Sequence, residues 1–232
     1  MFLLKVMIDI DGVIFDIHSY IEEKIRRDLD PTYSQRNILT YDINKSLNER
    51  LDKIFEEHWN DSTALCNIYK DSIQMLNYIP RSTRDAIFTA FKEPEVFQEC
   101  RVDMNAIDLI KSLISEGASV VFHTVSLSDE VKRVKEERIK ELLKGYEGEY
   151  KFCSCDNICE KCSGEYDYVI EDCLETLVEF SKINDKAELF LIAKSYNSPI
   201  MYGEYSHLFE TRIKRYNNAE NALKYILGKE YL

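Results

Sequence analysis

The stretch that decides the fold is Leu3-Leu4-Lys5-Val6-Met7-Ile8-Asp9-Ile10-Asp11-Gly12-Val13. It opens with a short run of mostly apolar residues, which is typical of a strand buried on both faces of a sheet. Asp9 and Asp11 end this run. Because side chains two residues apart point to the same side of a strand, both carboxylates are expected to face one crevice. Gly12 then allows the backbone to turn away from the strand.

The rest of the chain alternates between short apolar runs and amphipathic segments. We predict strands at 118–123, 150–153, 168–170 and 189–193, and helices at 106–114, 128–143 and 218–227. This alternation is typical of a parallel sheet with helical crossovers. Residues 18–95 differ, because they are charged and mostly of helical period. The predicted fold class is therefore α/β, a doubly wound parallel sheet built from 1–17 and 96–232, with a helical cap at 18–95 inserted after the first strand.

Composition restricts the partners. The 232 residues include 30 Lys and Arg against 42 Asp and Glu, a net charge of −12, which argues against a nucleic acid polymer as partner. There are seven cysteines, an odd number, and four of them lie within 153–162, which favours a reducing compartment over a secreted disulfide framework. No apolar run approaches the ~20 residues of a membrane span. We predict a cytoplasmic protein that binds a small molecule and no membrane, with a homodimer as an open alternative.

Polar residues follow the other predicted strands where they end. Thr124 ends the second strand, Lys161 follows the third, and Glu171-Asp172 end the fourth. In doubly wound sheets ligands bind at the carboxyl ends of the strands, so these side chains are expected to converge with the two aspartates of the first strand. An oxygen-rich, strongly negative group is the ligand set of Mg²⁺ rather than of zinc or copper. Such an ion would offset the repulsion between an acidic protein and a phosphate.

Four segments resemble the four motifs of the haloacid dehalogenase-like phosphotransferases. They are Asp9-Ile10-Asp11-Gly12-Val13-Ile14-Phe15-Asp16, Val120-Val121-Phe122-His123-Thr124, Lys161, and Val169-Ile170-Glu171-Asp172. Within that superfamily the chain is most similar to the 5'(3')-deoxyribonucleotidases. The similarity includes the closing Asp16 of the first motif, the ten residues from Lys161 to Glu171, and the segments 94–97, 195–197 and 212–218. The chain departs from the pattern at Glu171, a second acidic candidate, where the family usually has aspartate.

The resemblance implies a Rossmann-like core and a role for each matching residue. Asp9 would be the nucleophile that forms an aspartyl-phosphate. Asp11 would be the general acid for the leaving group and then the base for the hydrolytic water. Thr124 and Lys161 would bind the phosphate.

The same resemblance implies a magnesium site and a substrate. Mg²⁺ would be held by Asp9, the carbonyl of Asp11 and Asp172, and Asp16 and Trp59 are candidates for the substrate pocket. The implied activity is that of a Mg²⁺-dependent phosphomonoesterase, a hydrolase of nucleoside 5'- or 3'-monophosphates, in particular of the deoxyribonucleotides. The cap would close over the site and select the leaving group.

Two alternatives stay open at this stage. The first is the same phosphatase chemistry on another small ester, such as a sugar phosphate. The second is a non-catalytic binding protein of the same fold, in which zinc is held by Cys153, Cys155, Cys159 and Cys162. The charged run 132–144 is interpreted as a solvated helix face with pairs of opposite charge four residues apart.

Overall fold

A computed structural model describes residues 4–17, 19–21, 24, 90–155, 158–194, 197, 208 and 211–228. Nearly all of the predicted helical cap, residues 18–95, lies outside these ranges. The division into core and cap therefore stays a prediction.

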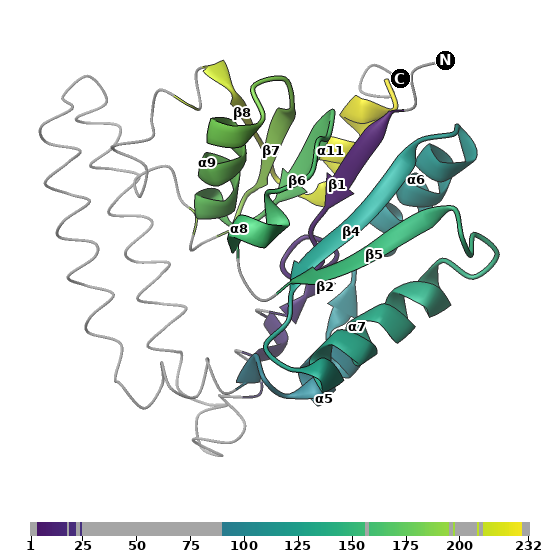
Figure 1. Ribbon diagram of the computed structural model, residues 1–232. Coiled ribbons are helices and arrows are strands. Elements are labelled where there is room, and N and C mark those ends of the chain that lie inside the picture. The colour runs from purple at the N-terminus through teal and green to yellow at the C-terminus, as the bar shows by residue number, and fades with distance from the viewer. Residues whose placement is uncertain are drawn as a thin grey trace, which may run out of the picture.

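The core is a six-stranded parallel sheet with the order β5-β4-β1-β6-β7-β8 (Figure 1). Its strands are β1 (Lys5–Ile8), β4 (Ser119–Val125), β5 (Tyr150–Cys155), β6 (Tyr168–Glu171), β7 (Glu188–Ile192) and β8 (Ile213–Tyr216). From β1 the chain adds β4 and β5 on one side, then crosses to add β6, β7 and β8 on the other. This order confirms the doubly wound fold and makes β1 the strand at which the winding reverses.

Helices cover both faces of the sheet (Figure 1). They are α5 (Pro94–Glu99), α6 (Met104–Ser115), α7 (Asp129–Leu142), α8 (Ile158–Lys161), α9 (Leu174–Ile183) and α11 (Ala219–Ile226). Side chains of β1 alternate between the two layers, because Val6 and Ile8 pack in the core cluster with α6, α7 and α11, and Met7 packs in the cluster with α9. A strand buried on both faces explains the uninterrupted apolar run in the sequence.

The predicted strands and the three predicted helices of the core are all present, with ends that differ by a few residues. Helices α5, α8 and α9 were not predicted, and two strand features were missed as well. The edge strand β8 is short and presents Lys214 and Arg215 to solvent, so it lacks an apolar pattern. A separate antiparallel pair joins β2 (Phe15–Asp16) to β3 (Arg101–Val102), and strands of two residues leave no periodic signal.

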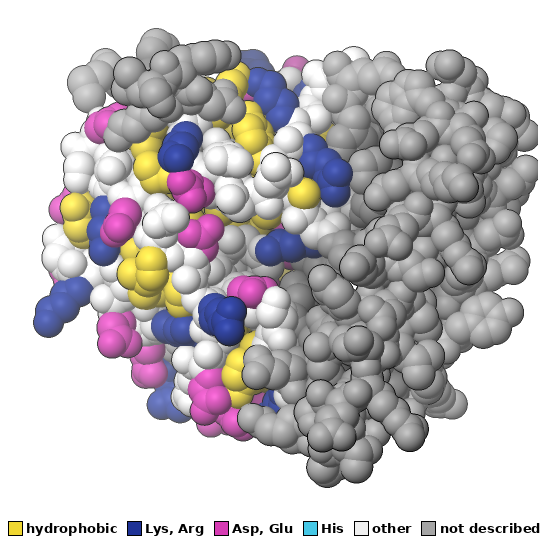
Figure 2. All heavy atoms as spheres, turned by 180° about the vertical axis from the view of Figure 1, so that it is seen from behind, with side chains coloured by type: hydrophobic (Ala, Val, Ile, Leu, Met, Phe, Trp, Pro, Cys, Tyr) yellow, Lys and Arg dark blue, Asp and Glu magenta, His cyan; other side chains and the backbone are white. Residues whose placement is uncertain are grey.

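The described surface mixes both signs of charge. On the face shown in Figure 2, Lys and Arg side chains are interspersed with Asp and Glu side chains. None of the helices that the structure describes combines the length and the apolar character needed to cross a bilayer.

Candidate active site

The site begins where β1 ends, at the reversal of the winding. Asp9 continues the ladder of β1, because its backbone N–H donates to the carbonyl of Ile170 at 2.9 Å. Gly12 has a φ of 73°, a left-handed conformation that favours glycine. It turns the chain away from the strand directly after Asp11. Parallel strands end at one edge, so Asp9 lies beside the ends of β4 and β6.

Asp9 is buried in an ion-paired group with Lys161 and Glu171. The Lys161 ammonium donates to Oδ1 of Asp9 at 2.5 Å and lies 2.7 Å from Oε2 of Glu171. The three residues belong to different elements, because Asp9 follows β1, Lys161 ends α8 and Glu171 ends β6. Each is at most 3% exposed, so the charges interact with little screening by water. The resemblance implied that Lys161 lies opposite Asp9 and the phosphate, and the structure shows its contact with Asp9.

The two carboxyl groups have perturbed acidity. Burial, with the nearby Asp11 and Asp172 charges, raises the pKa of Asp9 to about 7 although Lys161 opposes the shift. Burial and the charge of Asp9 raise the pKa of Glu171 well above its usual value. Burial alone would lower the pKa of Lys161, but Asp9 and Glu171 more than offset this and hold its pKa above the usual value. One lysine therefore does not compensate the negative charge that the fold buries here.

Asp172 extends this acidic group. Oxygens of Asp9, Glu171 and Asp172 lie within 4.8 Å of one another, and all three residues are buried. Among the described residues this is the one group of three or more side chains that could hold a metal ion. Asn197 supports the segment after β6, because its Nδ2 donates to the carbonyls of Asp172 at 2.8 Å and Ile192 at 2.7 Å. Three buried carboxylates against one lysine fit a hard divalent cation such as Mg²⁺.

Asp11 belongs to a second group of hydrogen bonds beside the first. Its Oδ2 accepts from Nζ of Lys135 at 2.5 Å and from Oγ1 of Thr124 at 3.3 Å. Thr124 is fully buried, and its hydroxyl also accepts from Lys135 at 3.0 Å. The two predicted catalytic aspartates therefore pair with different lysines, Asp9 with Lys161 and Asp11 with Lys135.

Lys135 was missed by the sequence analysis, which interpreted 132–144 as a solvated face. That interpretation is wrong for this residue, because Lys135 is 1% exposed. A signal was present, since Lys135 lies four residues after Val131 and four before Ile139, on the buried stripe of α7. A lysine in an apolar stripe needs an acceptor inside the fold.

Of the two pocket candidates, the structure describes Asp16. Asp16 lies on β2, where its Oδ1 accepts weakly from the backbone N–H of Ser19 at 3.4 Å, a local contact at the start of a helical turn. Trp59 lies outside the described residues.

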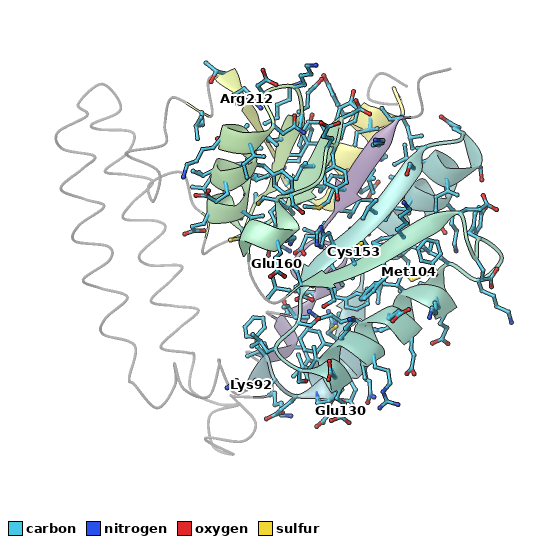
Figure 3. The ribbon with its side chains drawn as sticks, in the orientation of Figure 1. Lys92, Met104, Glu130, Cys153, Glu160 and Arg212 are labelled. Atoms are coloured by element: carbon cyan, nitrogen blue, oxygen red, sulfur yellow. The ribbon has the colours of Figure 1, made fainter. Side chains whose placement is uncertain are left out.

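The cysteines of 153–162 border the site on β5 and around α8. Figure 3 shows Cys153 on β5 and Glu160 on α8, on neighbouring elements. The Cys155 thiol donates to the carbonyl of Thr124 at 3.5 Å, and the Cys162 thiol donates to the carbonyl of Thr176 at 3.6 Å. The side chain of Cys159 is not described, so the four-cysteine zinc site stays a prediction.

His123 is a buried neighbour of the site. It lies on β4 opposite Cys153, is 8% exposed, and its Nδ1 has no hydrogen-bond partner among the described residues. Burial and the positive charge of Lys161 lower the pKa of His123 to about 4. The imidazole is therefore neutral at pH 7.

We expect His123 to make folding pH-dependent. Below pH 6.5 the unfolded chain takes up a proton on this histidine, whereas the folded chain does so only near pH 4. Wild-type protein should therefore lose about 2 kcal/mol more of its free energy of unfolding than His123→Gln between pH 7 and pH 5. Urea unfolding of both proteins at several pH values measures this difference. Parallel pH profiles of the two proteins would contradict the prediction.

Comparison with solved structures identifies the fold. A protein from Thermotoga maritima assigned as a beta-phosphoglucomutase matches with a TM-score of 0.51 at 14% sequence identity, over 99% of this chain and 100% of that chain. A dehalogenase crystallised as an intermediate complex matches with a TM-score of 0.51 at 13% identity, over 97% of this chain and 96% of that chain. No protein-family model matches the sequence, and comparison with curated proteins gives no match. At these identities the likeness is one of fold, and the chain has the haloacid dehalogenase-like fold.

Proposed function

We propose that the chain is a Mg²⁺-dependent phosphomonoesterase that hydrolyses nucleoside 5'- or 3'-monophosphates through an aspartyl-phosphate. The observation that supports this best is the pair of aspartates after β1, each bound to a different buried lysine, with the three-carboxylate group beside the first. Phosphoryl transfer needs this combination of nucleophile, proton carrier and concentrated charge.

In the first step Asp9 attacks the phosphorus atom. A carboxylate oxygen forms a bond to phosphorus as the bond from phosphorus to the leaving oxygen breaks. Lys161 orients the nucleophile, because its contact with Oδ1 fixes the direction of the Asp9 carboxylate. Its charge, at 4% side-chain exposure, favours the arrival of a phosphate dianion in a group that is otherwise negative.

Asp11 moves the protons. It donates a proton to the leaving oxygen, and in the second step it accepts a proton from the water that attacks the phosphorus of the aspartyl-phosphate. The products are an alcohol, inorganic phosphate and the regenerated Asp9 carboxylate. A second aspartate in this position has a use in phosphate ester hydrolysis, where a poor leaving group needs a proton.

Magnesium fits the residues present. Asp9 and Asp172, with the Asp11 carbonyl, would hold the ion, and Glu171 adds a third buried carboxylate to the group. When bound, Mg²⁺ supplies positive charge for the phosphate oxygens. The nucleotide as substrate rests on the sequence resemblance to the deoxyribonucleotidases. The cytoplasm as location and a small molecule as partner rest on the composition, and a homodimer stays possible.

Phosphate release from a panel of substrates tests the proposed function. We expect Mg²⁺-dependent release from deoxyribonucleoside and ribonucleoside 5'- and 3'-monophosphates, with slower release from hexose phosphates. Because the buried carboxylates repel a phosphate without a cation, a chelator should lower kcat by at least about 100-fold, and added Mg²⁺ should restore it. Equal or faster turnover of hexose phosphates would favour the sugar phosphate alternative. Bound stoichiometric zinc with no turnover would favour the binding protein.

Asp172→Asn separates metal binding from general damage. At 100 times the dissociation constant, Mg²⁺ should stabilise wild-type protein by about 2.7 kcal/mol, a shift of several degrees in Tm, and should stabilise Asp172→Asn much less. Asp185→Asn is the matched control, since Asp185 is exposed beyond α9. The same Mg²⁺ shift in wild-type protein and both variants would place the ion elsewhere.

A further inference from the structure

Lys135 is a buried cation whose contacts lie on one side of the site. From α7 its ammonium donates to Oδ2 of Asp11 at 2.5 Å, to Oγ1 of Thr124 at 3.0 Å and to the carbonyl of Val125 at 2.9 Å. It also lies 4.5 Å above the ring of Phe97. A lysine has three N–H donors, and these three acceptors use all of them.

These contacts make the two oxygens of Asp11 unequal. Oδ2 accepts from both Lys135 and Thr124. Oδ1 is buried and has no hydrogen-bond partner among the described residues. Because a carboxyl group is planar, fixing Oδ2 also fixes the direction of Oδ1. Two donors already occupy Oδ2, whereas Oδ1 has none among the described residues, so Oδ1 is the oxygen left to exchange a proton with a substrate.

We propose that Lys135 is a positioning residue that makes Oδ1 of Asp11 the oxygen that carries the proton. This inference rests on the proposed function and deepens it. As the bond from phosphorus to the leaving oxygen breaks, the proton leaves Oδ1 and bonds to that oxygen, while Oδ2 keeps its contact with Lys135. In the second step Oδ1 receives the proton of the attacking water.

The contacts argue against phosphate binding by Lys135. A cation that binds phosphate needs an N–H donor directed at the ligand. Lys161 contacts two carboxylates, Asp9 and Glu171, and so keeps one of its three donors for a phosphate. Lys135 has its three donors on Asp11, Thr124 and Val125. It therefore acts on the reaction through Asp11.

The leaving group provides the test. General acid catalysis contributes about 10²–10⁴-fold for a poor leaving group and little for a good one. We compare kcat/KM for the alkyl phosphate in the panel that wild-type protein hydrolyses fastest with kcat/KM for p-nitrophenyl phosphate, whose leaving group needs no proton. This ratio reports the steps up to formation of the aspartyl-phosphate. Lys135→Met should lose about 100-fold on the alkyl phosphate and less than about 5-fold on p-nitrophenyl phosphate.

A double-mutant cycle shows whether the effect passes through Asp11. Asp11→Asn should show the same dependence on leaving group as Lys135→Met. Adding Lys135→Met to Asp11→Asn should lower kcat/KM for the alkyl phosphate by less than about 3-fold, because the residue it positions is already gone. Lys132→Met, a change of the same kind at an exposed position of α7, is the control and should leave both substrates unaffected. Thermal unfolding monitors folding, and Lys135→Gln replaces Lys135→Met where the latter does not fold.

The outcomes separate the two proposals. Equal losses on both substrates, or a multiplicative loss in the double variant, overturn the role of Lys135 and leave the phosphatase in place. A raised KM with unchanged kcat on both substrates also overturns it, in favour of phosphate binding. Absence of wild-type turnover on every ester overturns the proposed function, and the role of Lys135 with it.

Discussion

Asp9→Asn is expected to lower kcat for phosphate release by about 10⁴-fold or more, the scale on which enzymes lose activity without their nucleophile. The amide of asparagine cannot attack phosphorus. Asp9 is the carboxylate at the end of β1, where the winding of the sheet reverses, and it accepts a hydrogen bond from Lys161. The variant should stay folded, because an amide of similar size replaces a carboxylate whose burial is costly. Steady-state phosphate release and thermal unfolding measure the two expectations.

Trapping gives a direct test of the same residue. Acid-quenched wild-type protein with substrate should hold a phosphoryl group on the peptide that contains Asp9, detectable by mass spectrometry, and Asp9→Asn should not. Asp108→Asn, an exposed aspartate on α6, is the matched control and should keep full activity. Near-normal turnover of Asp9→Asn would show that the nucleophile is another residue.

Lys161→Met is expected to have the largest effect on stability. It leaves Asp9 and Glu171 buried without their cation, and loss of one partner of a buried ion pair costs about 3–5 kcal/mol. Urea unfolding measures the change in the free energy of unfolding. Lys140→Met removes a lysine from an exposed pair with Glu136 and should change this free energy by less than about 1 kcal/mol.

The pH dependence of this deficit has a definite sign. Without Lys161 the carboxyl pKa values rise further in the folded state, so the folded chain binds more protons than the unfolded chain above about pH 4. Lys161→Met should therefore lose more stability at pH 8 than at pH 5. Adding Glu171→Gln to it should recover part of the loss, since one buried charge disappears. A deficit that is equal at both pH values would mean that packing, and not charge, explains it.

The sequence was informative where one physical rule determines the outcome. A strand buried on both faces has a continuous apolar run, and the carboxyl ends of parallel strands meet. The sequence could therefore predict that the strand ends at Asp9, Thr124 and Asp172 lie close together. The same reasoning could not show which cation each carboxylate takes.

The missed features depend on tertiary contacts. The contact of Lys161 with Glu171, which was not predicted, arises because a short helix after β5 ends at Lys161. Lys135 contacts Asp11 from the buried face of α7. Most residues around it in the sequence are charged, so the number of charges alone predicted an exposed helix face. The edge strand β8 is recognisable only by its pairing with β7. Whether Trp59 faces a substrate depends on residues beyond the described ranges.

The small β2–β3 ladder has a consequence for how this protein could be modified. Phe15 pairs with Val102 and Asp16 pairs with Arg101, so the two ends of the chain segment between β2 and β3 are held together. The entropic cost of bringing the two ends of a loop together grows only slowly with the length of the loop. A segment of another size or sequence in place of the predicted cap could thus be grafted between these two strands while the six-stranded sheet keeps its geometry.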